Sequence, residues 1–404
     1  MRLLLLTYGT EGDTRPLVML AHGLQQAGHR VQLLAERSTL GTAATLGVRH
    51  AALHGDIDSA VDALVGQGAS LLAASRGLAQ MARDQSAPWL AQASAAAAGC
   101  DAVLAGGLAA FIGVAAADQH ALPLIGVGTV PVTPTRAFPS TFLPPGPWPR
   151  WTNRPSHHLA TAQIWRQFRG PLNAARAQQA GLPALSRPPR DFPFLYGFSP
   201  ALLPTPADWP ADHLACGQWR LPDTAQALPA ELQQWLAHQP APVFIGFGSM
   251  RGFDPAAVFG GLIDALGQRP ILLSPGWAGL PDGWTPPPHV RICPPVPHEA
   301  LFPHCALVIH HGGSGTTHSA SRAGVPQLVL PMVADQPFWA RQLYQRGVAG
   351  PPLSRKRFDR PTLQRAIAVA TDAATVARAR ALGQAMAAED GVATAVTTLE
   401  RWLG

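Results

Sequence analysis

Residues 307–317 read LVIHHGGSGTT, and this stretch decides the fold. It opens with the apolar run Leu307–Ile309, passes through a glycine-rich turn, and continues at helical spacing through Ser314–Ala323. A buried strand that leads through a short turn into a helix is the repeating unit of a parallel sheet covered by helices on both faces. The stretch therefore predicts an α/β domain with this turn at the carboxyl end of a strand.

The turn itself predicts a binding site for a diphosphate. The first amides of a helix have no partner within the helix and carry partial positive charge. Glycines let an anion approach the backbone closely, while hydroxyl groups and an imidazole N–H add donors. The stretch has no GK[ST] sequence, which excludes a Walker-type loop. The residues that would hold the anion are His311, Gly312, Gly313, Ser314, Gly315, Thr316 and Thr317.

A carboxylate and an amide follow the next strand. Leu328–Leu330 reads as a strand, and Asp335 and Gln336 come shortly after it, so both side chains are expected at the same sheet edge as the turn. Two acceptors and an amide match the vicinal hydroxyls of a sugar. A polar cap on the helix that starts near Pro337 is the alternative for Asp335, but it does not account for Gln336.

The first fifty residues show the same alternation of strand and helix. Arg2–Tyr8 is an apolar run, Gly9–Pro16 is a polar loop, a helix follows up to Gly28, and Val31–Ala35 reads as the second strand. Later runs continue the series. The further predicted strands are Val48–Leu53, Ala102–Ala105, Leu124–Val127, Val243–Phe247 and Ile271–Ser274, and the further predicted helices are Pro255–Leu266 and Val392–Leu403.

These two series predict two doubly wound, Rossmann-like domains in tandem with parallel sheets. We place the first domain at residues 1–204, a proline-rich linker at 205–228, the second domain at 229–390, and a C-terminal helix at 391–404 that packs back on the first domain. Ligands of such sheets lie at the carboxyl ends of the strands, so two facing sheets are expected to form a cleft. Residues 129–160, rich in Pro, Trp and Phe, are expected to form an ordered apolar lid or wall.

Composition excludes several classes of protein. The chain has 404 residues, of which 47% are hydrophobic and 13% charged, so global disorder is excluded. The net charge of +6 is almost all arginine and lacks a basic run interleaved with aromatic residues, which argues against nucleic-acid binding and favours a small anionic ligand. The four cysteines are widely spaced, which disfavours disulfides and zinc.

No targeting or membrane-spanning segment is expected. The apolar run at Met1–Leu6 ends at Thr7 and lacks a cleavage site, and Ala102–Ala117 is too short and too rich in glycine to cross a bilayer. The sequence therefore predicts a soluble cytoplasmic protein.

Taken together, Val296–Trp339 resembles the nucleotide-sugar signature of the family 1 glycosyltransferases, which have the GT-B fold. The bacterial branch with sterol-type and antibiotic glycosyltransferases is the most similar. Gly9–Pro16 resembles the family loop G-[ST]-x-G-D-x-x-P, and Ala388–Ala393 resembles the C-terminal pattern of that branch. The positions at the spacing of the signature are His311, Gly324, Pro326, Pro331, Asp335 and Gln336.

The resemblance implies an inverting hexosyltransferase without a metal or other cofactor. It moves a hexose from a nucleotide-diphosphate sugar, with UDP-glucose as the default donor and a dTDP-sugar as the second choice, to a hydroxyl of a small hydrophobic acceptor such as a sterol, polyketide, antibiotic, flavonoid or lipid. The first domain would bind the acceptor and the second the donor. The donor-binding residues implied are Thr10, Ser249, Trp277, Val296, His311, Gly313, Ser314, Gly315, Thr316, Asp335 and Gln336.

Asp13 is implied as the general base that takes the proton of the acceptor hydroxyl. An ordinary carboxylate is a weak base for an alcohol, so proximity and partial burial must assist it. The alternative is that Asp13 caps a helix starting near Arg15.

Two positions depart from the family pattern. Plant members carry a carboxylate for the ribose at the position of Ser319, and many bacterial members carry an arginine at the position of Glu11. The arginine contact to the phosphate is therefore lost here, and a carboxylate at position 11 is expected to raise the pKa of Asp13 if the two lie close.

Other classes of function are weaker. Asp56-Ile57-Asp58 matches the metal-binding DxD motif superficially, but a helix start explains it better, and neither His157-His158 nor His304-Cys305 has further ligands at zinc spacing. A sugar-nucleotide epimerase of GT-B architecture and a non-catalytic nucleotide-sugar-binding helper protein are the remaining alternatives. The apolar 129–160 segment favours transfer to an acceptor over epimerisation, and the presence of both Asp13 and His311 argues against a non-catalytic homologue.

Overall fold

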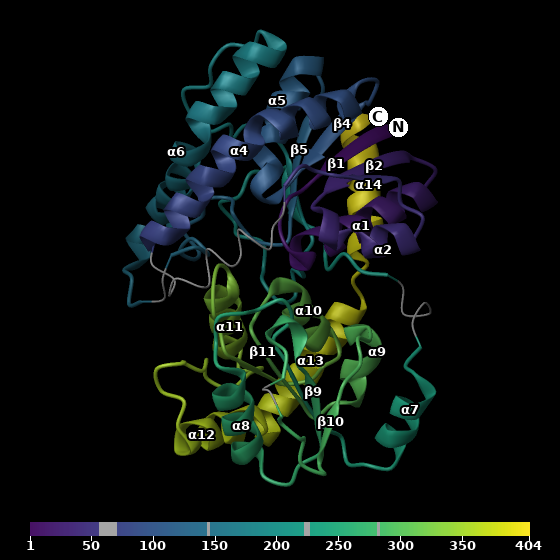
Figure 1. Cartoon of the computed structure of the whole chain (residues 1–404), viewed down its shortest axis with the longest axis vertical. Coiled ribbons are helices and arrows are strands. Elements are labelled where there is room, and N and C mark those ends of the chain that lie inside the picture. Colours follow the sequence, from purple (N-terminus) through teal and green to yellow (C-terminus); the bar gives the residue numbers. More distant parts are fainter. Residues whose placement is uncertain (56–70, 144–145, 222–226, 281–282) are drawn as a thin grey trace. The chain divides into compact units, whose positions relative to one another are not determined.

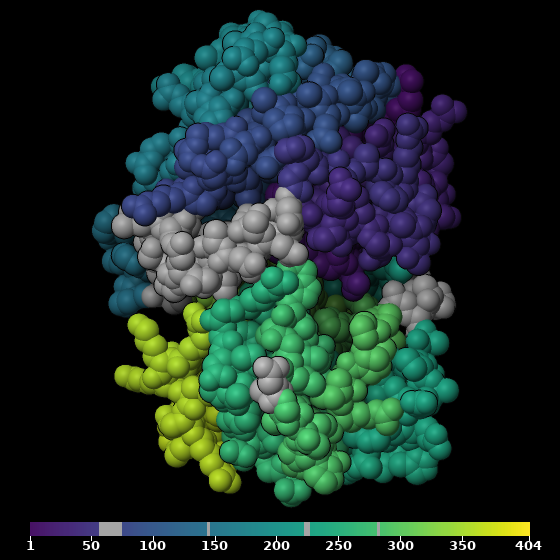
Figure 2. Space-filling model, in the orientation of Figure 1, coloured from purple at the N-terminus to yellow at the C-terminus, as the bar shows by residue number. Residues whose placement is uncertain are grey.

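The computed structural model of the chain describes residues 1–55, 71–143, 146–221, 227–280 and 283–404. The chain divides into two compact units, shown in Figure 1. Unit 1 comprises Met1–Pro200, Thr205–Arg220 and Asp390–Gly404, and unit 2 comprises Ala201–Pro204 and Leu221–Glu389. In the space-filling view of Figure 2, purple and blue residues belong to unit 1, and green residues belong to unit 2.

Unit 1 is built on a seven-stranded sheet with the order β3-β2-β1-β4-β5-β6-β7, in which every neighbouring pair is parallel. The central strands are continuous apolar runs because helices cover both faces. The strands are β1 (Arg2–Leu6), β2 (Arg30–Ala35), β3 (His50–Ala52), β4 (Ala102–Ala105), β5 (Leu124–Gly128), β6 (Phe194–Tyr196) and β7 (His213–Ala215).

Two groups of helices cover this sheet (Figure 1). One group packs its apolar side chains, among them the fully buried Trp89 and Phe168, on the face that carries Leu4 and Val103. It consists of α4 (Leu71–Ala97), α5 (Ala110–His120) and α6 (Asn153–Ala180). The other elements are α1 (Glu11–Gln26), α2 (Gly41–Thr45), α14 (Gly391–Leu403) and the short 3-10 helices η1 (Arg37–Thr39), η2 (Gly107–Ala109) and η3 (Arg150–Thr152).

The C-terminal helix α14 packs on α1 inside unit 1. A Cβ on Gly23 of α1 would lie 2.1 Å from Cγ1 of Val392, so the two helices meet where residue 23 has no side chain. His29 Nε2 lies 3.1 Å from Oε1 of Glu400, which ties the far end of α14 to the same unit.

Unit 2 is built on a five-stranded parallel sheet with the order β10-β9-β8-β11-β12. Alternate residues of the central strands serve two separate cores: Ile245 and Ile309 pack with α8 and α12, whereas Phe244 and Val308 pack with the residues of α7, α9 and α10. The strands are β8 (Val243–Gly246), β9 (Ile271–Ser274), β10 (Val290–Ile292), β11 (Leu307–His310) and β12 (Gln327–Val329).

The helices of unit 2 follow their strands in the order of a doubly wound domain. They are α7 (Ala230–Ala237), α8 (Pro255–Leu266), α9 (His298–Leu301), α10 (Ser314–Arg322), α11 (Gln336–Gln345), α12 (Arg360–Ala370) and α13 (Ala373–Ala387), with the 3-10 helices η5 (Gly276–Ala278) and η6 (Phe302–His304). No helix in the described ranges combines the length and the hydropathy needed to cross a membrane.

The predicted fold class, two α/β units with parallel sheets, is confirmed. Helix α8 has the predicted bounds, and α10 starts at the predicted Ser314. The segment 205–228, which the sequence assigns to a linker, differs: it contains β7, which pairs with β6 in the sheet of unit 1. The strands β6 and β7 have three residues each and no apolar run like those of β1 or β8, so the sequence does not reveal them.

The proline- and aromatic-rich segment 129–160 is ordered over the described residues and mixes buried with exposed side chains. Phe138 is buried, and His157 Nε2 lies 3.1 Å from its carbonyl oxygen. Trp151, in contrast, is 78% exposed. The segment therefore has an inner part that packs in unit 1 and an outer part that faces solvent.

Candidate functional site

The turn between β11 and α10 has the geometry predicted for an anion site. Gly312 has φ +93°, and a Cβ there would lie 2.7 Å from Cγ1 of Val329, so only glycine fits. Gly313 is the N-cap of α10 and supplies no side-chain cap, and the first bond of the helix runs from the Thr317 N–H to the Gly313 carbonyl at 3.0 Å. The positive end of α10 is therefore not capped by a side chain of the residue that precedes it.

His311 lies beside this helix end. Its half-buried ring is flanked by two glycines: a Cβ on Gly313 would lie 2.6 Å from Nε2, and a Cβ on Gly248 would lie 3.3 Å from Cε1. Nδ1 is shielded from solvent and has no hydrogen-bond partner among the described residues. Burial, and secondarily the neighbouring His298, lowers the pKa of His311 to about 4. The ring is therefore neutral at pH 7 and offers one N–H donor and one acceptor.

The preceding residue, His310, has a structural role. It is fully buried, with Nε2 2.9 Å from Oε1 of Gln327, and its Nδ1 accepts the Gly312 N–H at 3.1 Å. Burial lowers the pKa of His310 to about 3, so this ring is neutral as well. His310 thus fixes the turn, whereas Nδ1 of His311 has no partner among the described residues.

Asp335 is held by a tryptophan that the sequence analysis did not single out. The Trp339 indole N–H donates to Oδ2 of Asp335 at 2.8 Å, and the edge of His318 packs against the buried Trp339 ring. Asp335 is the N-cap residue of α11, yet its side chain makes no capping hydrogen bond. The capping alternative for its carboxylate is therefore not what the structure shows.

Gln336 supports the backbone next to Asp335. Its side chain is buried, and its Oε1 accepts the N–H groups of Met332 (2.8 Å) and Val333 (3.0 Å). Its Nε2 lies 3.2 Å from the Met250 sulfur. This bracing role is additional to the sugar-binding role that the sequence predicts, which stays a prediction.

Ser249 lies on the loop after β8, and Trp277 lies in η5, which is hydrogen-bonded to that loop. The Trp277 N–H donates to the Gly248 carbonyl at 2.9 Å, and a Cβ on Gly276 would lie 2.2 Å from that oxygen. The guanidinium of Arg251 lies over the Trp277 ring, 4.7 Å from its centroid. Because Gly248 also borders His311, the Arg251 guanidinium belongs to the loop that flanks the turn between β11 and α10. Arg251 is a candidate that sequence reasoning missed, because no motif marks it.

A carboxylate reaches Ser319 from another helix. The Ser319 hydroxyl donates to Oε1 of Glu299 at 2.9 Å and to the Gly315 carbonyl at 3.0 Å. Glu299 belongs to α9, two residues after Pro297 and next to the predicted base-binding Val296, which is half-buried. A carboxylate thus lies beside position 319, where the plant pattern has a carboxylate of its own.

In unit 1, Asp13 lies at the start of α1 and folds back over Gly9. The helix begins at Glu11, not near Arg15 as the capping alternative assumed, so Asp13 occupies the third helical position and Thr10 the N-cap. Oδ2 of Asp13 accepts the Thr10 N–H at 2.8 Å, which closes a capping box. A Cβ on Gly9 would lie 2.2 Å from the same oxygen.

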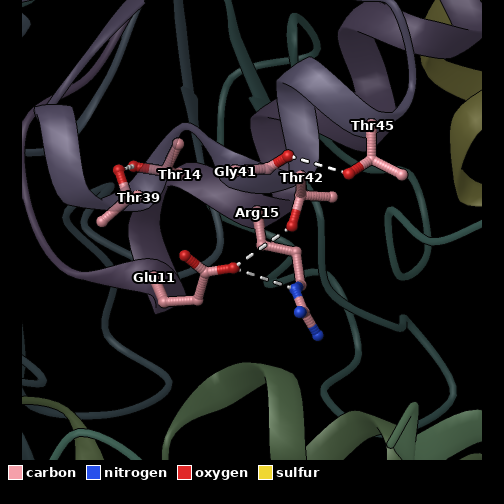
Figure 3. Close-up of polar contacts among 7 residues, drawn as sticks. All are labelled: Glu11, Thr14, Arg15, Thr39, Gly41, Thr42 and Thr45. Atoms are coloured by element: carbon pink, nitrogen blue, oxygen red, sulfur yellow. Dashed lines mark hydrogen bonds and ion pairs between the residues drawn. The ribbon is translucent and has the colours of Figure 1, made fainter. Parts of the chain in front are cut away.

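The environment of Asp13 makes it a stronger base than an exposed aspartate. Burial raises its pKa, and the two hydrogen bonds from Thr10 oppose this in part. Glu11 does not contribute as the sequence analysis expected: Figure 3 shows its carboxylate bonded to Arg15 Nε (3.2 Å) and the Thr42 hydroxyl (3.4 Å). Glu11 is therefore neutralised locally by Arg15.

In the ranges that the structure describes, no three His, Cys, Asp or Glu side chains lie close enough together to hold a metal ion. His157 is buried against Phe138, and His304 belongs to η6. Asp56-Ile57-Asp58 lies outside the described residues.

Comparison with solved structures defines the class of fold. The glycotransferase of kitacinnamycin superposes with a TM-score of 0.71 at 18% identity, covering 100% of this chain and 99% of that one. The spinosyn rhamnosyltransferase SpnG gives a TM-score of 0.69 at 25% identity, covering 99% and 100%, and has also been solved with thymidine diphosphate and with the spinosyn aglycone. These are GT-B structures.

Sequence comparison then gives the family. Residues 278–401 match the family described as Erythromycin biosynthesis protein CIII-like, C-terminal domain. O-mycaminosyltylonolide 6-deoxyallosyltransferase of Streptomyces fradiae is 33% identical over 100% of this chain and 97% of its own length. A sterol 3-beta-glucosyltransferase of Arabidopsis thaliana is 31% identical over 98% of this chain, which spans 64% of that longer protein. The chain therefore belongs to the family 1 glycosyltransferases, whose members are inverting and work without a metal cofactor.

Proposed function

We propose that the chain transfers a hexose or deoxyhexose from a nucleoside diphosphate to a hydroxyl of a hydrophobic natural product or sterol, with inversion at the anomeric carbon. The observation that carries this proposal is the N-terminus of α10. Its N-cap residue is a glycine without a capping side chain, and it lies beside the neutral His311, whose Nδ1 has no partner among the described residues. A helix terminus of this kind attracts a diphosphate, and its donors stabilise the charge that develops as the diphosphate leaves.

The donor nucleoside is thymidine or uridine, and we test thymidine first. The Streptomyces relative is named for transfer of a 6-deoxyallosyl group, and SpnG has been solved with thymidine diphosphate, which supports a dTDP-deoxysugar. The glucosyltransferase relatives support glucose as the sugar and keep UDP-glucose, the sequence-based default, as the second choice. Glu299 is a suitable acceptor for the 3′-hydroxyl of either nucleoside and for the 2′-hydroxyl that only uridine carries.

In this proposal, unit 2 holds the donor. His311 and the residues from Gly313 to Thr316 bind the diphosphate, with Arg251 as the nearby cation, and Asp335, fixed by Trp339, accepts from sugar hydroxyls. The remaining donor-binding residues keep their predicted roles: Thr10 and Ser249 at the phosphates, Val296 and Trp277 at the base, and Gln336 at the sugar.

Asp13 of unit 1 acts as the general base. It takes the proton of the acceptor hydroxyl as the oxygen attacks the anomeric carbon from the side opposite the leaving group. The bond from that carbon to the phosphate oxygen breaks, and the nucleoside diphosphate leaves with the electron pair. Burial of Asp13 supports this role because a raised pKa strengthens the base.

We also propose that the chain acts in the cytoplasm. Its four cysteines (Cys100, Cys216, Cys293 and Cys305) are all free thiols, and burial raises the pKa of each of them, so they are poorly ionised at neutral pH. Four free thiols, three of them buried, suit a reducing compartment.

A thermal-shift series with dTDP, UDP and GDP tests the donor site, because a ligand that binds only the folded protein raises its melting temperature. We expect dTDP and UDP to raise the melting temperature more than GDP, and His311→Gln to abolish the difference. An equal response to all three nucleotides would contradict the proposal. Glycosyl transfer is then assayed with the preferred sugar nucleotide and a panel of macrolide and sterol acceptors.

A further inference from the structure

The positive charge of the chain is concentrated in one segment of unit 1. Residues 119–190 contain eight arginines and neither aspartate nor glutamate, whereas the whole chain carries a net charge of +6, so the rest of the chain is slightly acidic. The eight are Arg136, Arg150, Arg154, Arg166, Arg169, Arg176, Arg187 and Arg190. A charge asymmetry of this kind acts on association with a partner rather than on the fold.

Of these arginines, only Arg176 is buried, where it pairs with Asp118 at 2.7 Å. The other seven are exposed. Three of them, Arg136, Arg150 and Arg154, border an open depression of about 650 Å³. We call this surface the Arg–Trp patch; it is lined by Arg136, Arg150, Trp151, Arg154, Pro155 and His158.

Large apolar side chains protrude beside these charges. Trp151 is 78% exposed in the patch itself, and Leu159, one helical turn after Pro155 on α6, is 57% exposed. Phe142 and Trp148 on the preceding loop are 45% and 47% exposed. Scattered exposed apolar residues are ordinary, but four large ones within 18 residues, next to three arginines, indicate an interaction site.

The charged groups that face the patch leave it positive. Arg190 adds a further cation, its Nη1 lying 3.0 Å from Nδ1 of His158, and both Arg190 and Arg154 lower the pKa of that histidine, after burial, so the ring stays neutral. Asp208 is the acidic neighbour. It is already engaged by the Arg136 N–H at 2.9 Å and by the Thr135 hydroxyl at 2.5 Å.

We propose that the Arg–Trp patch docks unit 1 on a bilayer surface rich in anionic phospholipid. The arginines contact lipid phosphates, and Trp151 and Leu159 enter the region between headgroups and acyl chains, where indole rings and aliphatic side chains are stable. A small soluble anion would neutralise the arginines but leave the apolar side chains in water. The bases of single-stranded RNA would stack on tryptophan, but they would not cover the exposed leucine.

Co-sedimentation with vesicles tests this proposal on the full-length chain, without reference to the transferase reaction. Vesicles of phosphatidylcholine with about one third phosphatidylglycerol are compared with pure phosphatidylcholine vesicles. We expect binding to the anionic vesicles alone, and loss of it in high salt. The double variant Arg150→Gln/Arg154→Gln lowers the partition coefficient about 30-fold, at about 1 kcal/mol for each arginine near an anionic surface.

Two further variants separate charge from insertion. Trp151→Ser lowers the partition coefficient about tenfold and abolishes a vesicle-induced blue shift of tryptophan fluorescence, since it removes one large apolar side chain from the interface. The matched control is Arg37→Gln/Arg401→Gln, which removes the same charge from exposed arginines of unit 1 outside the patch and leaves binding within twofold of the wild type.

Four outcomes would overturn the proposal. They are equal binding to neutral and anionic vesicles, an equal loss in the control pair, displacement by inorganic phosphate beyond that caused by sodium chloride of the same ionic strength, and binding of a poly(U) oligonucleotide in place of vesicles. The third would identify a small-anion site and the fourth a nucleic-acid surface. Circular dichroism of each variant establishes that it is folded.

Discussion

Two strand-to-helix turns, one after an inner strand of each sheet, differ in what occupies the helix N-terminus. Between β1 and α1, the N-cap is Thr10, and the carboxylate of Asp13 returns to the Thr10 N–H at 2.8 Å. Between β11 and α10, the N-cap is Gly313, which has no side chain to offer. The first terminus supplies its own negative charge through the half-buried carboxylate of Asp13. The second has no such group, and in our proposal it takes the negative charge of the diphosphate. The same strand-to-helix unit would then serve two opposite electrostatic purposes.

The largest test of this contrast removes the base without disturbing the cap. Asp13→Asn keeps an oxygen that can accept the Thr10 N–H, so α1 should stay intact, but it cannot take a proton. We expect the turnover number to fall about 10²- to 10⁴-fold, the usual contribution of a general base, with nucleotide affinity unchanged. Steady-state kinetics and thermal shift measure the two quantities. The control is Glu11→Gln, which alters the carboxylate bonded to Arg15. Retained turnover in Asp13→Asn would make Asp13 a capping residue only.

The next test displaces Asp13 instead of neutralising it. In Gly9→Ala the new Cβ would lie 2.2 Å from Oδ2 of Asp13, so the carboxylate must move. A displacement of about 1 Å is enough to lower turnover roughly 100-fold. Gly12→Ala is the matched control, because its Cβ would meet nothing nearer than the Thr10 hydroxyl at 3.6 Å. Equal kinetics of the two variants would show that the fold of Asp13 over Gly9 has no part in catalysis.

The pH dependence sharpens the same point. The base must be ionised to act, so kcat/KM should rise tenfold per pH unit below the pKa of Asp13 and level off above it. Because burial raises that pKa, the acid limb should extend above the ordinary range near pH 4. A pH–rate profile of the wild type, measured with a donor in excess, gives the limb. Its presence at the same pH in Asp13→Asn would assign it to another group.

At the other turn, a methyl group can probe for the anion. A Cβ at position 315 would have no atom within 4 Å, and alanine has a higher helix propensity than glycine. The melting temperature of ligand-free Gly315→Ala should therefore equal or exceed that of the wild type. A phosphate drawn against the first turn of α10 would meet the methyl, and we expect nucleotide affinity to fall about tenfold. Unchanged affinity in isothermal titration would place the diphosphate away from this turn.

The smallest expected effect concerns the ribose. Glu299→Gln keeps a partner for the Ser319 hydroxyl but weakens acceptance from sugar hydroxyls, so UDP should lose about three- to tenfold in affinity. Deoxyribose lacks the 2′-hydroxyl, so dTDP should lose less. Competition titrations with both nucleotides give the ratio, and Glu231→Gln, 91% exposed on α7, is the control. An equal loss for both nucleotides would show that Glu299 does not bind the 2′-hydroxyl.

Much of the fold could be predicted because burial imposes periodicity. The apolar runs of β1, β8 and β11, closed by glycine turns, mark both sheets, and Ser314 marks the start of α10. The short strand β7 carries no such pattern, so the sequence places residues 205–220 in a linker although they belong to unit 1.

The site could be predicted in its residue types but not in its partners. The glycines and His311 of the phosphate turn follow from the chemistry of a helix terminus, and the placement of Asp13 on α1 required the observed capping box. The support of Asp335 by Trp339 joins residues four apart at the start of α11, a spacing that is visible in the sequence. The approach of Glu299 to Ser319, in contrast, joins two different helices. Such contacts depend on how side chains pack in three dimensions, which spacing along the chain does not encode.

The position of α14 has a consequence for how the protein is made. The chain leaves unit 1 at Arg220, builds unit 2, and returns with the helix whose Val392 fills the space above Gly23. During translation, an apolar side of α1 therefore stays uncovered until α14 has been synthesised. Unit 1 therefore completes its folding after unit 2 has been synthesised, and deletion of residues 391–404 is expected to destabilise unit 1.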